Sequence, residues 1–459
     1  MAKIKLTPRV LRRALVLLMK IGVVLFLSFL FFLVLSKFTP VLFYQRGNYF
    51  GFAFYAFLFS VIALPYDAFK IGILRLRELI FSFILTLILT NTITYAVLAL
   101  ISKALISPIP MLILTVTQLV IGMILYYVSN RLYYKLYPAR NTVIVYSSAQ
   151  WDREVAKKFK AQDKRYLIKA VLKEEAGFEK IIRALTNNNT LIIGQVSIKL
   201  RYKLVNYCYE NKKRIFIMPS VDDIILHNAH VTQIGDSLMY LVKNRSLSME
   251  QWIIKRLIDI FLSLLILLLT LPMTLVIAVI IKLTDGGPIF FRQIRYTRNK
   301  TKFNIYKFRS MIVDAEKDGA QFTTDNDERI TPIGRFIRKT RIDEIPQFIN
   351  VFRGEMSIVG PRAERVENHD AYVKDMPEFE YRLKVKAGIT GYAQIYGKYN
   401  TSFEDKARMD IYYIENYSIA NDLKLLMATI KVIFKSDATE GFDKTFIELE
   451  PNDDVEKDY

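Results

Sequence analysis

Two acidic residues stand side by side in a strongly basic part of the chain. Asp343 and Glu344 lie in the stretch RIDEIPQ (341–347), and Arg338 and Arg341 precede them. A pair of carboxylates among bases can hold Mg²⁺ against a diphosphate. An aspartate can also attack phosphorus and form an acyl phosphate. The pair is therefore a candidate site for phosphoryl-transfer chemistry.

A plainer interpretation of Asp343 competes with that chemistry. Apolar residues follow the pair at helical spacing: Ile345, Phe348, Ile349 and Phe352. This spacing predicts a short amphipathic helix that begins near Asp343. Asp is a favoured N-cap, Pro346 is tolerated in a first turn, and Gly354 is a plausible stop. A cap contributes ~1 kcal/mol of stability and no chemistry, and spacing alone leaves both interpretations open.

The composition indicates a membrane protein. Of the 459 residues, 52% are hydrophobic and 13% aromatic, 24% are charged, and the formal net charge is +20. Membrane proteins collect Lys and Arg in their cytoplasmic loops, which accounts for the charge. No recognisable nucleic-acid-binding module accompanies it, so we expect no nucleic acid among the partners. The single cysteine, Cys208, excludes an internal disulfide and fits a reducing compartment.

Four apolar runs have about the ~20 residues that a helix needs to cross a bilayer. They are residues 15–36, 49–65, 79–101 and 109–129. Lys and Arg number five before the first run, and the next four loops carry two, three, one and three. Because cytoplasmic loops are the more basic, this alternation places both ends of the bundle in the cytoplasm. Residues 1–139 are thus predicted to form a multi-pass bundle of four spans.

The chain changes character after Pro138. Four short apolar runs read as strands: residues 142–147, 166–172, 190–196 and 214–220. Helical stretches separate them, the first over 151–162, so we predict a small parallel α/β (Rossmann-like) module in the cytoplasm, over 140–247. The turn after the first strand reads YSSAQ and lacks a G-x-G-x-x-G. We therefore favour a structural or regulatory role for this module over nucleotide binding.

A fifth apolar run, residues 260–281, carries no charge and is long enough to span. Bases flank both of its ends: Lys255, Arg256, Lys282, Arg292, Arg295 and Arg298. Both flanks therefore have a cytoplasmic character. Pro272, near the middle, removes a backbone donor and kinks a helix. We expect a re-entrant helix over 252–282 that dips into one leaflet and returns, and an ordinary kinked fifth span is the alternative.

Basic and aromatic residues interleave in two stretches beyond this run, 285–311 and 331–362. One interpretation is a cationic face on anionic lipid. The other is a phosphate pocket, since Arg binds phosphate in bidentate fashion. The two interpretations are compatible, because an enzyme that acts on a lipid phosphate needs both.

The order of motifs in the C-terminal half resembles a known family. The motifs are KRLIDI, GGPIFFRQ, YKFRSM, TPIGRFIRKTRIDEIPQFINVFRGEMSIVGPR, AGITGYAQ and DIYYIENYS, spread over residues 252–434. They resemble the catalytic domain of the bacterial polyprenyl-phosphate sugar-phosphate transferases, the monotopic phosphoglycosyltransferases that start surface glycan assembly. The four spans and the middle module resemble the larger, multi-span members, of the undecaprenyl-phosphate glucose or galactose phosphotransferase type.

The resemblance implies a role for each matching residue. Asp343 is expected to be the nucleophile and Glu344 its partner, and both are expected to bind Mg²⁺. Arg338 is expected to bind phosphate. Contacts to the nucleotide sugar are expected from Lys307, Arg309 and Arg362.

Three positions depart from the family's pattern. A Ser–Pro pair usually breaks the re-entrant helix, whereas here Leu271 precedes Pro272. Ala387 and Ala363 stand where proline is common. None of these positions belongs to the acid pair, so we expect them to change local geometry more than activity.

These features predict three parts and a tail. A bundle of four spans (1–139) and the α/β module (140–247) precede an α-rich catalytic domain with the re-entrant helix (248–436) and an acidic tail (437–459). The location implied is the bacterial inner membrane, with the active site at the cytoplasmic face.

The resemblance implies transfer of a sugar 1-phosphate from a UDP-sugar to undecaprenyl phosphate, with release of UMP. Such a lipid would start a capsule, exopolysaccharide or O-antigen repeat, and the transfer would pass through a phospho-sugar on Asp343. Glucose or galactose is the expected sugar. A homodimer and downstream glycosyltransferases are further partners left open. Two other functions also stay open: a nucleotide-sugar hydrolase of similar chemistry, and a non-catalytic membrane scaffold for polysaccharide assembly.

Overall fold

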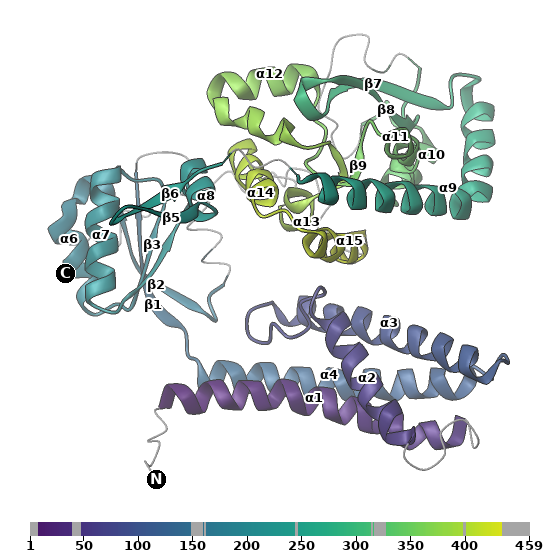
Figure 1. Cartoon of the computed structure of the whole chain (residues 1–459), viewed down its shortest axis with the longest axis horizontal. Coiled ribbons are helices and arrows are strands. Elements are labelled where there is room, and N and C mark those ends of the chain that lie inside the picture. The colour runs from purple at the N-terminus through teal and green to yellow at the C-terminus, as the bar shows by residue number, and fades with distance from the viewer. Residues whose placement is uncertain are drawn as a thin grey trace. The chain divides into compact units, whose positions relative to one another are not determined.

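The computed structural model divides the chain into two compact units, Met1–Met218 and Pro219–Tyr459. The residues that it describes are 8–38, 47–147, 159, 162–243, 247–313, 315, 327–397 and 401–433. The expected acidic tail lies outside them, as does most of the expected helix over 151–162. Figure 1 shows the elements of each unit in chain order.

The first unit begins with four apolar helices. They are α1 (Pro8–Phe38), α2 (Gly47–Ala63), α3 (Leu76–Ser102) and α4 (Ile109–Leu136). α1 packs against α2 and α4, and α3 packs against the same two helices, so the four form a closed bundle. Each of the four apolar runs identified in the sequence is thus a helix.

A buried polar network joins all four helices of the bundle. The Tyr55 hydroxyl of α2 donates to Asn91 Oδ1 of α3 at 2.7 Å. Asn91 Nδ2 donates to Gln118 Oε1 of α4 at 2.9 Å, and Gln118 Nε2 donates to the Leu27 carbonyl of α1 at 2.9 Å. Polar side chains of this kind hold helices together in hydrocarbon, where packing alone discriminates poorly between arrangements. All four residues lie near the middle of their helices, which brings the four helix centres to one level.

Among the described residues, four helices are long and apolar enough to cross a membrane, and three of them are spans that the sequence predicted. They are the segments Val10–Val34, Leu76–Ser102, Ile109–Leu136 and Met249–Thr284. The first three belong to the bundle and the last to the second unit. α2 has 17 residues, and at 1.5 Å per residue it is ~26 Å long. That length lies at the lower limit of what crosses the ~30 Å hydrocarbon core.

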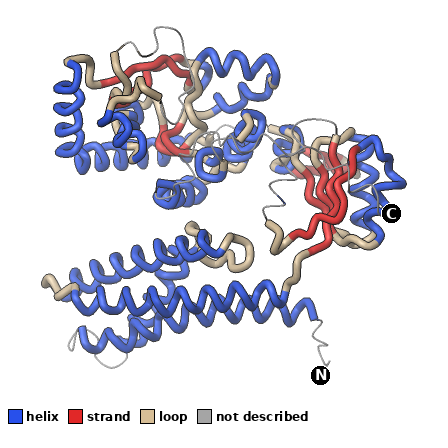
Figure 2. Tube along the Cα trace, turned by 180° about the vertical axis from the view of Figure 1, so that it is seen from behind, coloured by secondary structure: helices blue, strands red, loops and turns tan. Residues whose placement is uncertain are grey.

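The predicted strands of the α/β module are confirmed. They are β1 (Arg140–Tyr146), β2 (Tyr166–Lys173), β3 (Thr190–Ile193) and β4 (Arg214–Ile217). They form one sheet in the order β2-β1-β3-β4, and every neighbouring pair is parallel. The helices α6 (Gly177–Thr186) and α7 (Ile198–Glu210) pack on the sheet through Ile181 and Leu204. Figure 2 shows the strands side by side, with helices against them.

The second unit begins before the long apolar helix. A short helix, α8 (Val221–His227), is followed by an antiparallel hairpin, β5 (His230–Ile234) and β6 (Ser237–Leu241), which the sequence did not predict. Val221 and Ile224 of α8 form a cluster with Ile411 of α14 (Phe403–Glu415). Residues on the two sides of the long helix thus share one small core.

That long helix, α9 (Met249–Asp285), contains Pro272. Its first turn is fixed by a capping box between Ser248 and Gln251. Figures 1 and 2 both show that α9 changes direction along its length. Sharp kinks in helices are almost always at proline or a similar break, so we assign the bend to Pro272. In the most apolar stretch of α9, only 11% of the residues are buried.

The rest of the second unit packs around two small sheets. β7 (Phe290–Tyr296) and β8 (Lys302–Phe308) form a hairpin, and β9 (Ser357–Val359) pairs in parallel with β10 (Gly388–Thr390). The helices are α10 (Pro332–Lys339), α11 (Gln347–Arg353), α12 (Val366–Asp375), α13 (Tyr392–Tyr396), α14 and α15 (Ile419–Ile433). Their shared core contains Ile305, Val351, Ile358, Tyr413 and Leu425.

Candidate active site

The acid pair lies in a tight turn between two helices. Asp343 and Glu344 belong to a 3₁₀ turn, Ile342–Glu344, which links α10 to α11. Arg341 precedes it with φ of 56°, the left-handed conformation, and so reverses the chain after α10. The turn presents both carboxylates near the C-terminal end of β8, because it packs on that strand as well as on α10.

The interpretation of Asp343 as a helix cap is wrong. α11 begins at Gln347, its N-cap position is Pro346, and no side chain caps it. The N–H groups of Phe348 and Ile349 donate to the carbonyls of Ile345 and Pro346, each at 3.0 Å, so the first turn of α11 does not depend on a carboxylate cap. The predicted stop is confirmed, since Gly354 ends α11 in the left-handed conformation at φ of 86°. Asp343 is thus left available for a role other than capping.

Cations bind one acid of the pair more closely than the other. Lys307 Nζ of β8 lies 3.1 Å from Glu344 Oε1 and 3.9 Å from Asp343 Oδ2. Arg362 Nη2 lies 3.6 Å from the same Glu344 oxygen. Glu344 therefore holds both cations, whereas the one ion pair of Asp343 within the described part of the chain is the longer contact with Lys307.

The pKa values of the two acids shift in opposite directions. Burial raises the pKa of Asp343, and the adjacent charge of Glu344 adds to it, against the opposing effect of Lys307. Burial by itself would also raise the pKa of Glu344, but Lys307 and Arg362 outweigh it and lower that pKa to about 2. Two neighbouring carboxyl groups with separated pKa values are a common feature of catalytic sites.

A buried asparagine fixes the distance between the strand and the turn. Asn350 of α11 accepts a hydrogen bond from the Tyr306 N–H at 3.0 Å and donates to the Asn304 carbonyl at 2.7 Å. Both bonds tie α11 to β8, the strand that carries Lys307. Asn350 is fully buried. It therefore holds Lys307 opposite the turn that carries Glu344.

Three glycines hold the loop that carries Arg362. A Cβ atom on Gly388 would lie 2.1 Å from Gly360 N, and one on Gly391 would lie 2.1 Å from Gly360 O. Real side chains never make contacts this short, so the two backbone segments can cross only as glycine. The motifs SIVGPR and AGITG thus meet at this crossing, and Gly388 donates to the Pro361 carbonyl beside Arg362.

The two alanines that replace common prolines are both buried in this region. Ala387 N–H donates to Thr297 Oγ1 at 3.2 Å, and the Thr297 hydroxyl donates to the Glu355 carbonyl at 2.9 Å. A proline at residue 387 has no N–H and could not make the first bond. The departure from the family's pattern is thus accompanied by a hydrogen bond that the usual residue cannot form.

The other two predicted substrate ligands, Arg338 for phosphate and Arg309 for the nucleotide sugar, lie in different surroundings. Arg338 is in the last turn of α10, and its charge lowers the pKa of Asp343. Arg309 follows β8 and is 8% exposed. Its guanidinium lies against Gly287, where an added Cβ would meet Arg309 Nη1 at 2.0 Å. The structure thus brings Lys307, Arg338 and Arg362 around the acid pair and places Arg309 against the chain that leaves α9.

Among the described residues, the acid pair is the candidate magnesium site. Within the described residues, no group of three His, Cys, Asp or Glu side chains could hold a metal. Mg²⁺ is usually bound by one or two carboxylates, and substrate phosphates and water complete its shell. The pair fits this pattern, because the raised pKa of Asp343 indicates that the protein's own cations do not fully compensate this buried carboxylate.

Two threonine hydroxyls flank the proline in α9. Thr270 Oγ1 donates to the Ile266 carbonyl at 2.7 Å, and Thr274 Oγ1 donates to the Leu271 carbonyl at 2.9 Å. Such bonds between a hydroxyl and a preceding carbonyl favour bending of a helix. They supply hydroxyl contacts on both sides of Pro272, although Leu271 itself cannot.

Sequence reasoning missed the residues that position the site, above all Asn350, Thr297 and the glycine crossing. One signal was present in the sequence. Asn350 interrupts the apolar pattern of α11, and a polar residue at such a position is often buried with its hydrogen bonds satisfied. The apolar spacing itself was misleading, because Phe352 is 45% exposed whereas Gln347 and Asn350 are buried.

Comparison with known proteins matches this part of the chain. Residues 250–436 match the model of a family described as bacterial sugar transferase. The chain is 40% identical over 217 residues to the UDP-N-acetylgalactosamine-undecaprenyl-phosphate N-acetylgalactosaminephosphotransferase of Aeromonas hydrophila, covering 44% of this chain and 51% of that protein. It is 43% identical over 183 residues to the UDP-glucose:undecaprenyl-phosphate glucose-1-phosphate transferase of Klebsiella pneumoniae, covering 39% of each.

The chain thus spans about half or less of the length of these two relatives. A third relative is matched almost completely. The exopolysaccharide production protein PSS of Rhizobium leguminosarum is 40% identical over 187 residues, which are 39% of this chain and 94% of that protein. With a relative this similar over nearly its whole length, the chain belongs to the bacterial sugar transferase family.

Proposed function

We propose that the protein transfers a sugar 1-phosphate from a UDP-sugar to undecaprenyl phosphate, and so starts the repeat unit of a surface polysaccharide. The observation that carries this proposal is the unequal ion pairing of the two acids. Glu344 is held by Lys307 at 3.1 Å and by Arg362 at 3.6 Å, whereas the Asp343 side chain is 13% exposed and lies 3.9 Å from Lys307 Nζ. Asp343 is therefore the carboxylate available to attack phosphorus.

The transfer has two steps. In the first, an Asp343 carboxylate oxygen attacks the phosphorus that bears the sugar, and the bond from that phosphorus to the bridging oxygen of UMP breaks. UMP leaves with the electron pair, and an acyl phosphate links Asp343 to the sugar. In the second, an oxygen of undecaprenyl phosphate attacks the same phosphorus, the Asp343 carboxylate leaves, and the lipid-linked diphosphate sugar forms.

The cations around the pair have a role in both steps. Lys307, Arg338 and Arg362 surround the position that a diphosphate must occupy to meet Asp343. Their positive charge stabilises the charge that develops on the phosphoryl oxygens and on the leaving UMP. Arg309, which follows β8, would contribute only by contacting the nucleotide part of the UDP-sugar. Mg²⁺ held by Asp343 and Glu344 would supply additional neutralisation of the diphosphate.

The contacts at the two ends of α9 support a re-entrant helix. Near its start, Lys255 donates to the Val359 carbonyl at 3.0 Å. Near its end, Ile277 and Ile281 pack against Phe308 and Ile337. A helix that crossed the bilayer would hold its two ends on opposite sides of it, and these contacts join both ends to one globular core.

The order of the chain gives a second argument for the same topology. α8 precedes α9 and packs on α14, which follows α9. Because these elements share a core, we infer that the segments before and after α9 lie on the same side of the membrane. The basic flanks of α9 support the proposal that this side is the cytoplasmic face of a bacterial inner membrane.

We propose a hexose as the transferred sugar. The names of the matched relatives include N-acetylgalactosamine and glucose, so the family as a whole does not fix it. We retain glucose or galactose as the first sugars to test. A homodimer and downstream glycosyltransferases that extend the lipid-linked sugar are the other partners that we propose.

The deciding experiment is intact-protein mass spectrometry. Purified protein with Mg²⁺ and a UDP-hexose, without lipid acceptor, should gain a hexose phosphate on Asp343 and release an equal amount of UMP. Added undecaprenyl phosphate should discharge this adduct. Initial rates with both substrates varied should give parallel double-reciprocal lines. Intersecting lines and no adduct would show direct transfer and leave Asp343 as a metal ligand only.

The same assays separate the two other functions. Catalytic UMP release that continues without undecaprenyl phosphate, beyond one equivalent of enzyme, would identify a hydrolase. Normal polysaccharide production in cells that carry only an Asp343→Asn protein would identify a scaffold. We expect neither outcome.

A further inference from the structure

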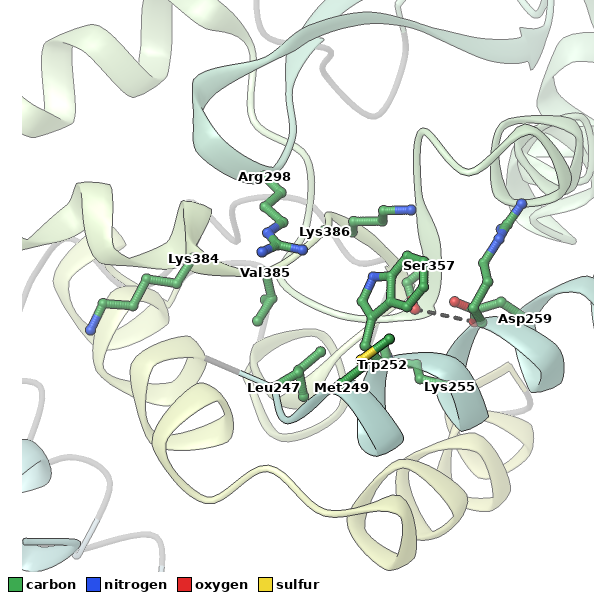
Figure 3. A pocket seen from close by; sticks show the side chains of 11 residues that line it. Leu247, Met249, Trp252, Lys255, Asp259, Arg298, Ser357, Lys384, Val385 and Lys386 are labelled. Atoms are coloured by element: carbon green, nitrogen blue, oxygen red, sulfur yellow. Dashed lines mark hydrogen bonds between the residues drawn. The ribbon is translucent and has the colours of Figure 1, made fainter. Parts of the chain in front are cut away.

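A cavity lies beside the first turns of α9, within the second unit. Its volume is about 320 Å³. The start of the apolar helix lines one part of it, with Trp252, Arg256 and Asp259. Segments from the rest of the second unit line the other part, with Arg298 and Lys386. Figure 3 shows Trp252 between Arg298 and Lys386 on one side and the axis of α9 on the other.

The cavity has an excess of positive charge. Two of its cations have acidic partners outside it, because Lys255 pairs with Asp422 at 2.5 Å and Lys384 pairs with Glu415 at 3.4 Å. Arg256, Arg298 and Lys386 then face a single carboxylate, that of Asp259.

That carboxylate is also engaged elsewhere. Asp259 Oδ1 accepts hydrogen bonds from Ser357 Oγ at 3.1 Å and from the Ile358 N–H at 2.9 Å. Among the described residues, Arg298 Nε is buried without a hydrogen-bond partner. Burial, together with repulsion by Arg256 and Arg298, lowers the pKa of Lys386. A partly buried cluster of cations with an unused donor is stabilised by an anion, and phosphate is the anion that such clusters bind best.

The cavity is separate from the acid pair. Arg298 lies in the turn of the β7–β8 hairpin, whereas Lys307 lies at the opposite end of β8. Lys307 is five positions after Lys302 in this strand, or roughly 17 Å away at ~3.3 Å per residue. At the other end of α11 from the acids, a Cβ on Gly354 would lie 3.5 Å from Lys386 Nζ. A phosphate bound here is therefore out of reach of Asp343.

The exposed surface next to the cavity is apolar and continuous with α9. Met249 is 74% exposed, Leu257 62% and Phe261 66%, and Trp252 is of the type that anchors proteins at the membrane surface. A lipid could thus place its phosphate on Arg298 and Lys386 and its chains along α9. We propose that this cavity binds the headgroup of an anionic membrane phospholipid, at a site distinct from the one that carries out the reaction.

The fluorescence of Trp252 allows a direct test, because the chain has only two tryptophans. In a full-length Trp151→Phe protein, Trp252 is the single reporter and lines the cavity. The protein is placed in nanodiscs of phosphatidylcholine that contain bromine-labelled phosphatidylglycerol or, at the same mole fraction, bromine-labelled phosphatidylcholine. We expect stronger quenching by the labelled phosphatidylglycerol, since the cavity enriches the anionic lipid.

Two variants with the same loss of charge test the site. Arg298→Gln with Lys386→Gln should remove the excess quenching, with an affinity for phosphatidylglycerol about tenfold or more lower, as for the loss of a charge-assisted contact. Lys300→Gln with Lys374→Gln removes two exposed charges outside the cavity and should keep the excess. Equal quenching by the two labelled lipids, or an excess that survives in the Arg298 and Lys386 variant, would overturn the proposal. Displacement of the labelled lipid by soluble glycerol phosphate or by a UDP-sugar would also overturn it, because the site would then take a soluble phosphate.

Discussion

Lys307 Nζ lies 3.1 Å from a carboxylate oxygen of Glu344, at the point where β8 meets the turn that carries the acid pair. Lys307 and Arg362 together lower the pKa of Glu344 to about 2, whereas that of Asp343 is raised, first by burial. Glu344 is therefore a fixed anion that orients two cations. Asp343, one residue earlier, keeps a carboxylate whose buried charge is only partly compensated, and this difference leads to opposite expectations for the two amide variants.

We expect Asp343→Asn to stabilise the protein while it abolishes turnover, with a loss on the order of 10³-fold or more, as when a nucleophile is removed. The folded pKa of Asp343 is raised above its ordinary 3.8. The folded state thus binds more protons than the unfolded state just above that pH, and stability falls as the pH rises through the folded pKa. At neutral pH the ionised side chain is a net cost, which asparagine avoids. Thermal unfolding in metal-free buffer should show a higher Tm for the variant at pH 7 and no difference below pH 3.8.

An exposed carboxylate provides the control for this variant. Asp375→Asn at the end of α12 makes the same chemical change outside the site, and its Tm should equal that of the unchanged protein across the pH range. A lower Tm for Asp343→Asn than for Asp375→Asn at pH 7 would contradict our account of the buried charge.

Glu344→Gln should destabilise the protein. Its folded pKa of about 2 lies below the ordinary 4.5, so the unfolded state binds a proton first as the pH falls. The stability that the carboxylate contributes is then fully present above pH 4.5 and is lost as the pH falls towards 2. We expect a loss of roughly 1–3 kcal/mol at pH 7, below the ~3–5 kcal/mol of fully buried pairs because Arg362 is half exposed. Chemical unfolding curves at pH 7 and pH 3 measure it, and a loss of equal size at both would refute the assignment.

The Asn350→Ala substitution should reduce turnover, although we do not expect Asn350 to contact a substrate. It leaves the Tyr306 N–H and the Asn304 carbonyl without their partner, at a cost of roughly 1–3 kcal/mol. With the tie to β8 lost, Lys307 shifts relative to Glu344, and kcat in the UMP-release assay should fall more than KM rises. Asn416→Ala removes a local bond to the Tyr412 carbonyl in the same unit and serves as the control. An unchanged kcat in a destabilised Asn350→Ala protein would show that the residue is structural only.

Thiol labelling in intact cells can determine on which side of the membrane each end of α9 lies. With Cys208 replaced by serine, single cysteines at Ser248 and Thr284 should both resist a membrane-impermeant reagent, because both ends of α9 are expected in the cytoplasm. Leu105 lies between α3 and α4 and is 93% exposed, so a cysteine there should be labelled from outside. Labelling at residue 284 together with protection at residue 248 would mean that α9 spans the membrane, and the cytoplasmic active site would have to be given up.

A truncated protein tests the role of the first unit. A chain that begins at Pro219 should release UMP in nanodiscs at a rate comparable to the whole protein, since a relative exists in which the matched region makes up 94% of the length. A chain that begins at Ser248 should also be active but less stable, because Ile411 loses Val221 and Ile224, at ~1.5–3 kcal/mol for each fully buried side chain. Loss of activity in a folded protein from residue 219 would assign a catalytic role to the first unit.

Much of the architecture follows from local pattern. The four apolar runs are helices and the four short runs are the strands of one parallel sheet. Hydrophobic length and alternation report whether a segment is covered by lipid or by a core, and both are properties of neighbours in the chain. The motif order likewise placed the acid pair, Lys307, Arg338 and Arg362 in one domain. The distances between these residues could not be predicted, because no local sequence signal encodes them.

The tertiary structure decided what the residues in those segments do. Spacing left open whether Asp343 is a helix cap. In the structure Pro346 takes the N-cap position of α11 and Arg341 turns the chain in front of the acid pair, so the carboxylate lies against β8 instead. The opposite pKa shifts of two adjacent acids depend on Lys307, 36 residues before Asp343, and on Arg362, which a crossing of glycine backbones holds in place. Sequence determines which groups are available, and only the long-range contacts that bury and pair them determine which carboxylate is held by cations and which is only partly compensated.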